Sequence, residues 1–108
     1  MEDSEELKPI EVKIGSQIAY FPGHVSYGNF NHPDVERGFV VSLALGTPSV
    51  HSIVFCRFWR KGSAELRTVT NSEACHLGDL RLIDTHPQSY VNGVARRLGY
   101  EVDALSDL

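Results

Sequence analysis

Apolar and polar residues alternate along much of the chain with the two-residue period of a β-strand. In "VKIGSQIAYF", residues 12–21, this alternation places Ile18 and Tyr20 on one face and Ala19 and Phe21 on the other. The Pro-Gly pair that follows is a strong turn signal. The pattern therefore predicts a first strand that ends at this pair.

The same period predicts four further strands. A long loop, "GHVSYGNFNHPDVER", precedes the second strand, and long loops in compact domains are often functional. The second strand, "GFVVSLAL", places Phe39, Val41 and Leu43 on one face. The remaining three are predicted in "VHSIVFCRFWR", "AELRTVTN" and "LRLID", residues 50–60, 64–71 and 80–84.

Two segments have a helical pattern instead. Residues 70–80, "TNSEACHLGDL", predict one helical turn, because Thr70 and Glu73 have the spacing of a capping box. In residues 85–102, "THPQSYVNGVARRLGYEV", apolar side chains recur every four residues, and Gly99 is placed to end the helix. Thr85 and Gln88 could cap its start.

Short strands followed by one helix predict a mainly β protein, a small five-stranded SH3-like barrel with a short C-terminal α-helix. A closed barrel removes exposed sheet edges. A chain of 108 residues is expected to form one domain. We expect an acidic, flexible N-terminus at 1–9, the barrel at 10–84, and the helix with an acidic tail at 85–108.

Composition limits where in the cell we expect the protein to act and which kinds of partner we expect it to bind. No apolar run approaches the roughly 20 residues that span a bilayer, and the acidic start is unlike a signal peptide. We expect a cytoplasmic protein without membrane contact, in which Cys56 and Cys75 are free thiols. The net charge of −4 argues against a protein that coats nucleic acid. It favours a partner protein with a basic surface.

Four stretches resemble small SH3-like barrel proteins encoded by bacteriophages. They are "KIGSQIAYFPGH", "HPDVERGFVVSL", "VFCRF" and "TNSEACHLGDLRLI", within residues 13–83. Ile18 stands where valine is usual, the linker "LALGTPSVHS" is longer than usual, and the C-terminal helix is additional. The resemblance implies a phage protein acting in the host bacterial cytoplasm, and it implies no reaction and no catalytic residues.

The triplet His32-Pro33-Asp34 allows two interpretations. As chemistry, it would be an acid–base pair or a set of metal ligands. As structure, it would be a turn in which proline fixes φ and the aspartate bonds the backbone, and this interpretation is favoured. The other histidines and cysteines lack the paired spacing of a structural zinc site, so neither a metal nor another cofactor is expected.

A nucleophilic role for Cys75 is also disfavoured. A thiolate at the start of a helical turn would be stabilised by the helix dipole. It would need a histidine and a carboxylate from elsewhere, such as His32 and Asp34. We expect Cys75 and Cys56 to be packed core residues, and we expect no enzymatic activity.

Aromatic residues divide into core and surface candidates. Phe55 and Phe58 are expected in the core. Tyr27 and Phe30 in the long loop, with Trp59 at a strand end, could be core residues or an exposed wall that contacts a partner. For these three the two interpretations stay open.

A basic cluster supports a rival function. Residues 57–67 contain four cations against the single Glu65, and the aromatic Phe58 and Trp59 lie between them. Such a stripe could bind single-stranded nucleic acid, or it could be the polar face of a hairpin. The cations are Arg57, Arg60, Lys61 and Arg67.

The sequence thus favours a non-catalytic protein-binding module. In the phage context we expect it to inhibit a bacterial host or defence protein by steric occlusion, as anti-CRISPR proteins do; this expectation rests on analogy. The alternative is a nucleic-acid-binding barrel that uses the basic cluster. The expected partner-binding residues are Tyr27, Phe30, His32, Asp34 and Trp59.

Overall fold

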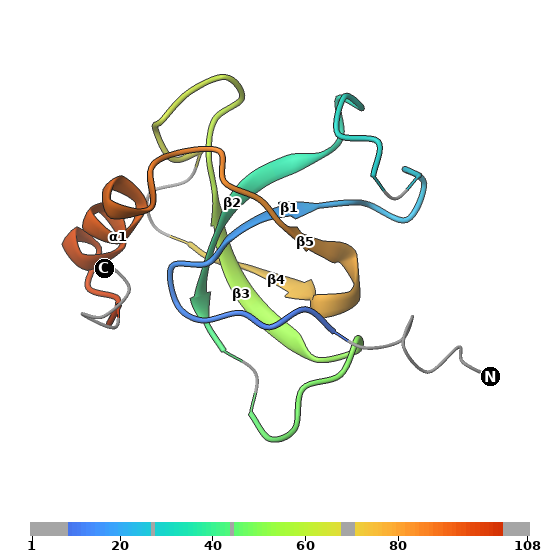
Figure 1. The fold of residues 1–108 in the computed structure, drawn as a ribbon, viewed down its shortest axis with the longest axis horizontal. Coiled ribbons are helices and arrows are strands. Elements are labelled where there is room, and N and C mark those ends of the chain that lie inside the picture. The colour runs from blue at the N-terminus through green and yellow to red at the C-terminus, as the bar shows by residue number, and fades with distance from the viewer. Residues whose placement is uncertain (1–8, 27, 44, 68–70, 103–108) are drawn as a thin grey trace.

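The computed structural model describes residues 9–26, 28–43, 45–67 and 71–102, and it confirms a mainly β protein. Five strands precede one α-helix within these residues (Figure 1). A short 3₁₀ helix, Leu77–Asp79, lies between the last two strands. The strands are β1 (Gln17–Tyr20), β2 (Glu36–Ser42), β3 (Ile53–Phe58), β4 (Glu73–His76) and β5 (Leu80–Leu82), and the helix is α1 (Gln88–Arg97).

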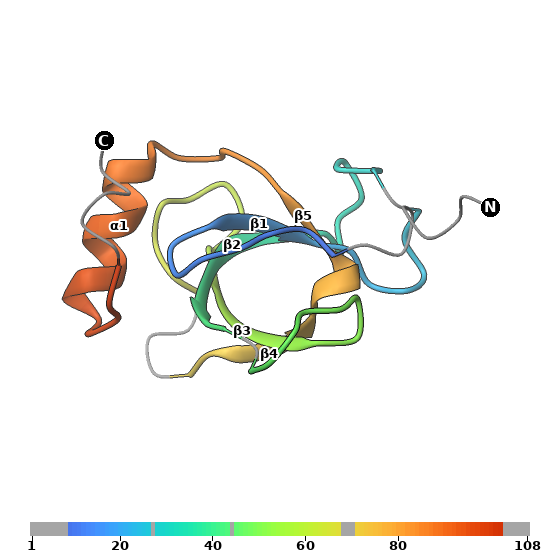
Figure 2. The same cartoon turned by 60° about the horizontal axis from the view of Figure 1, so that its bottom comes forward.

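All five strands belong to one antiparallel sheet with the order β4-β3-β2-β1-β5. The sheet curls into a half-barrel, so that β3 and β4 face the layer of β1 and β5 (Figure 2). A bulge between Val40 and Ser42 shifts the β2–β3 register, and bulges increase the local twist of a sheet. The architecture agrees with the small SH3-like barrel that the sequence predicts.

The alternation along the strands separates the apolar side chains into distinct clusters. Ile18 and Val40 lie inside the curl, together with Phe58 and Leu80 from other strands. Ala19 points to the opposite face of β1, where it packs under the long loop between β1 and β2. The two predicted faces of β1 are therefore confirmed.

The helix covers the outer face of β2. Val91, Val94 and Ala95 are buried against Phe39 and Val41. Pro87 precedes α1 and no side chain caps its N-terminus, so the predicted capping by Thr85 and Gln88 is wrong. The chain leaves the helix at Gly99 with φ of +96°, a conformation that glycine adopts readily.

Among the described residues, no helix has the length and apolarity needed to cross a membrane. The N-terminal segment and the acidic tail that the sequence sets apart lie almost entirely outside the described residues. The division of the chain into these parts stays a prediction.

One predicted element is wrong in part and another is wrong. The segment 70–80 does contain the predicted helical turn, the 3₁₀ helix Leu77–Asp79 directly before β5, but the residues before it, Glu73–His76, form β4 and pair with β3. The predicted strand 64–71 contributes only a single bridge, from Leu66 to Trp59, within its described part. Residues 68–70 of the predicted strand lie outside the described residues. The last of them, Thr70, is also the first residue of the predicted helical turn.

Gly38 permits the tight curl between β2 and β3. It pairs with Phe58, and a Cβ atom added at Gly38 would overlap the carbonyl oxygen of Arg57 and lie 2.8 Å from the Cα atom of Phe58. Both obstacles are backbone atoms, which cannot move without breaking the sheet. Gly93 in α1 differs, because no atom lies within 4 Å of the position its Cβ would take.

We therefore expect opposite effects from two matched glycine substitutions. Gly38→Ala should lower the free energy of unfolding by about 3 kcal/mol or more, as overpacking of backbone does. Gly93→Ala should raise it by about 0.5–1 kcal/mol, because alanine has the higher helix propensity. Urea denaturation measures both changes, and equal effects of the two variants would contradict the assigned curl.

Candidate functional site

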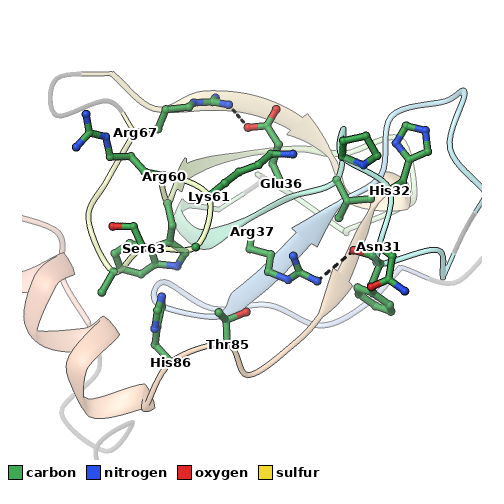
Figure 3. Close-up of a pocket in the computed structure, with 16 residues that line it drawn as sticks. Asn31, His32, Glu36, Arg37, Arg60, Lys61, Ser63, Arg67, Thr85 and His86 are labelled. Carbon is green, nitrogen blue, oxygen red and sulfur yellow. Dashed lines mark hydrogen bonds and ion pairs between the residues drawn. The ribbon is translucent and has the colours of Figure 1, made fainter.

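A pocket of about 690 Å³ opens between three segments that are distant in the sequence (Figure 3). One wall is the end of the β1–β2 loop with the start of β2, the second is the segment after β3, and the third is the segment that leads into α1. This size falls within the range of about 300–1,000 Å³ that is usual for ligand pockets. Its polar and charged lining residues are Asn31, His32, Glu36, Arg37, Arg60, Lys61, Ser63, Arg67, Thr85 and His86.

The β1–β2 loop is held in place by its own small apolar cluster. Phe21, Val25 and Val35 are buried beneath it, and the ring of Phe30 meets that of Phe21 edge-on at 5.1 Å between centroids. Arg37 closes this wall, because its guanidinium donates a hydrogen bond of 3.3 Å to the carbonyl oxygen of Phe30. The same guanidinium lies 5.9 Å from the centre of the Phe30 ring.

The third wall depends on the buried side chain of Gln17 in β1. Its carboxamide nitrogen donates to the carbonyl oxygen of His86 at 2.8 Å, and its oxygen accepts the backbone N–H of His86 at 3.0 Å. Gln88 strengthens the junction by donating to the carbonyl oxygen of Gly15 at 2.7 Å. Tyr90 then joins α1 to the second wall through a hydrogen bond of 2.9 Å to the carbonyl oxygen of Ala64.

Two buried nitrogen atoms of the pocket lining have no hydrogen-bond partner among the residues that the structure describes. They are Nε1 of Trp59 and Nε2 of His86, whose rings meet edge-on at 4.8 Å between centroids. Trp59 is only 5% exposed and packs against Phe39. Buried polar groups are nearly always hydrogen-bonded. Both atoms are fully covered, so a bound polar group would reach them only after the lining side chains move.

The cations around the pocket differ in what neutralises them. Arg60 pairs with Glu65 at 3.1 Å, and its guanidinium points away from the pocket (Figure 3). Arg67 pairs with Glu36 and Glu73. Burial disfavours the charge of Arg67, but the hydrogen bonds and charges of these two glutamates outweigh it and raise the pKa of Arg67.

Arg37 and Lys61 have no carboxylate partner among the residues that the structure describes. Figure 3 shows Lys61 extending across the pocket from the second wall toward the side of His32. Within the described residues neither cation forms an ion pair, although the charge of Lys61 adds to the hydrogen bond from His24 in lowering the pKa of Asp34. The pocket is suited to an anionic group.

The expected partner-binding residues are partly gathered here. Phe30, His32 and Trp59 line the pocket, and Asp34 lies in the adjoining turn. Trp59 is a buried floor residue and Phe30 is half-buried, so they do not form an exposed aromatic wall. Tyr27 lies outside the described residues.

The proposed basic stripe is interrupted. Arg57 is 3% exposed, and its guanidinium donates to the hydroxyl oxygen of Tyr100 at 3.4 Å. It lies on the outer face of β3, where the chain that follows α1 covers it. The inclusion of Arg57 in a nucleic-acid surface is therefore wrong, and only Arg60, Lys61 and Arg67 remain exposed.

The His32-Pro33-Asp34 triplet forms a turn. The backbone N–H of Asp34 donates to Nδ1 of His32 at 3.0 Å, and the N–H of Val35 donates to the carbonyl oxygen of His32 at 3.1 Å. His24, from the start of the same loop, bonds the Asp34 carboxylate through Nε2 at 2.6 Å. This hydrogen bond lowers the pKa of Asp34.

The cysteines are core residues, as the sequence predicts. Cys56 and Cys75 are buried in the cluster inside the curl. Their mutual hydrogen bond and burial raise the pKa of Cys56, so this thiol stays protonated. Cys75 lies in β4 and is buried inside the curl, so the proposed helix-dipole activation is wrong. The prediction that Phe55 lies in the core is also wrong, because its ring is on the outer face and 40% exposed.

Sequence reasoning missed Arg37, Thr85 and His86. Arg37 immediately precedes a strand and reads as an ordinary polar end of a loop. Thr85 and His86 read as the start of a helix, and nothing local indicates that they meet Trp59. The contact between Gln17 and the backbone of His86, supported by the hydrogen bonds of Gln88 and Tyr90, brings them to the pocket.

Comparisons with protein-family models, with curated proteins and with solved structures found no match. The fold and the pocket alone therefore define the class of protein. It is a small SH3-like barrel with a cationic pocket at the junction of two loops and the segment that leads into its C-terminal helix.

We expect Gln17→Leu to weaken the third wall. The change leaves the backbone N–H and carbonyl of His86 without their partner, which costs about 1–3 kcal/mol for buried groups. Urea denaturation measures the loss, and hydrogen exchange should show faster opening of α1. Asn31→Ala, an exposed carboxamide, should change stability by less than about 0.5 kcal/mol. Equal effects would contradict the role of Gln17.

Proposed function

We propose that the chain is a non-catalytic binding module whose pocket receives an acidic segment of a partner protein. The observation that carries the proposal is that Arg37 and Lys61, which form no ion pair within the described part of the chain, lie at a pocket with two ring nitrogens that have no hydrogen-bond partner there. A carboxylate would accept charge-assisted hydrogen bonds from both cations and from Nε1 of Trp59. The half-buried Phe30 ring would contact the apolar part of the same segment.

A protein segment fits the charge distribution better than an extended polynucleotide. Nucleic acids are bound by arrays of lysine and arginine along a continuous surface. Here Arg57 is buried, Arg60 and Arg67 are paired with glutamates, and Arg37 and Lys61 lie together at one pocket. A single acidic group suits this arrangement, and the acidic remainder of the chain would repel a long polyanion.

The partner follows from the phage resemblance. In that context it is a bacterial host protein, such as a component of a CRISPR defence system, and docking inhibits it by steric occlusion. The positions of His32, Asp34 and Cys75 support the absence of catalysis, because the thiol is buried inside the curl while Asp34 is exposed in a turn of the β1–β2 loop. The identity of the partner and its inhibition by occlusion both rest on the proposed binding role.

Comparative capture from a nuclease-treated bacterial lysate tests the role of the pocket. The bait proteins are the wild type, Lys61→Glu and Lys13→Glu, since Lys13 is an exposed lysine that does not line the pocket. A protein retained by the wild type and Lys13→Glu should be lost with Lys61→Glu. With the purified partner, calorimetry should show Lys61→Glu to bind at least about tenfold more weakly.

Two results would overturn the proposal. Retention of the same protein by all three baits would show that the pocket does not bind it. Retention of nucleic acid alone in an untreated lysate, with affinity falling steeply as salt increases, would favour the nucleic-acid alternative.

A further inference from the structure

The β1–β2 loop brings together three side chains that can ligate a metal. His24, His32 and Asp34 each offer one ligand atom, and these atoms lie within 4.8 Å of one another. The His24 and Asp34 atoms are already in contact at 2.6 Å. The two imidazole rings lie 5.6 Å apart between centroids, and their planes are inclined by 72°.

The apolar cluster beneath the loop holds this arrangement. Val25 follows His24 in the chain and Val35 follows Asp34, and both valines are buried in the same cluster. The two ligand-bearing backbone segments are therefore fixed side by side. The turn hydrogen bond from Val35 N–H to the carbonyl oxygen of His32 then fixes the position of His32 relative to Asp34.

We propose that His24, His32 and Asp34 form a binding site for a zinc ion. Two imidazoles and a carboxylate are ligands that zinc prefers, with bonds of about 2.0–2.2 Å. Tetrahedral geometry then requires ligand atoms about 3.3 Å apart. The distances in the loop, 2.6 Å for one pair and at most 4.8 Å overall, bracket that value.

Binding of zinc would displace one proton from the site and would leave the fourth coordination position of the metal open to another ligand. Zinc would take the place of the proton that His24 Nε2 shares with Asp34, so these two ligands need little movement. His32 would turn from its hydrogen bond with the Asp34 backbone to present a lone pair. Three protein ligands leave a fourth position, which water or a donor group of another molecule would fill.

The proposed zinc ligands do not include the cations of the partner pocket, although the charge of Lys61 acts on Asp34. His24 and Asp34 do not line the pocket, and only His32 is common to both. Metal binding and partner binding are therefore tested by different variants. Loss of the Lys61 effect on a partner would leave the zinc site unaffected, and absence of zinc binding would leave the pocket unaffected.

Calorimetric titration with zinc chloride tests the site on the whole chain without a polyhistidine tag. The wild type should bind one equivalent, and binding should weaken at least about tenfold in His24→Ala and in Asp34→Ala. His51→Ala, which removes an exposed histidine outside the cluster, should bind as the wild type does. Calcium should not compete, because it prefers oxygen ligands.

Cobalt provides a second measurement that does not depend on the folding of any variant. Cobalt added to the wild type should give the visible absorption bands of a four- or five-coordinate site, and zinc should remove them. The proposal is overturned if the wild type binds neither metal. It is equally overturned if His24→Ala and Asp34→Ala retain the wild-type affinity for zinc.

Discussion

The carboxamide of Gln17 is the contact on which the functional surface depends. It is buried in β1, and it satisfies both backbone groups of His86 across 69 positions of sequence. A leucine at this position would suit a core strand equally well, but it would leave the segment before α1 without an anchor. The barrel would then have two loops facing solvent, and the floor formed by Trp59 and His86 would lose one side. A buried polar residue here converts a simple barrel into a barrel with a pocket.

Glutamates neutralise some cations of the pocket and leave others unpaired, and this explains why the pocket suits an anionic group although the chain as a whole is acidic. Arg60 and Arg67 are neutralised by neighbouring glutamates and maintain the shape of the loop after β3. Arg37 and Lys61 keep their charge available, and they flank a floor with unpartnered ring nitrogens. An acidic group entering between them exchanges its hydration for charge-assisted hydrogen bonds, which are among the stronger polar contacts in proteins.

The period of the sequence predicts β1, β2, β3, β5 and α1, because each buries apolar side chains, although β5 buries only Leu80. It fails at β4, where the spacing of Thr70 and Glu73 imitates a helix cap while pairing with β3 decides the conformation. Arg57 shows a second limit, since alternation puts it outside the barrel but cannot reveal that Tyr100 covers it. The pocket arises from contacts between distant segments, and the meeting of His24 with Asp34 depends on how the β1–β2 loop folds back on itself; no local pattern contains either.

The central claim is that an acidic segment of a partner binds at the pocket floor, and the single tryptophan of the chain reports on it directly. A nitrogen-15 NMR spectrum contains one indole N–H signal, which belongs to Nε1 of Trp59. Titration with the purified partner should shift this signal strongly, because a carboxylate would become the missing hydrogen-bond acceptor. Saturating binding that leaves the indole signal unmoved would contradict the account.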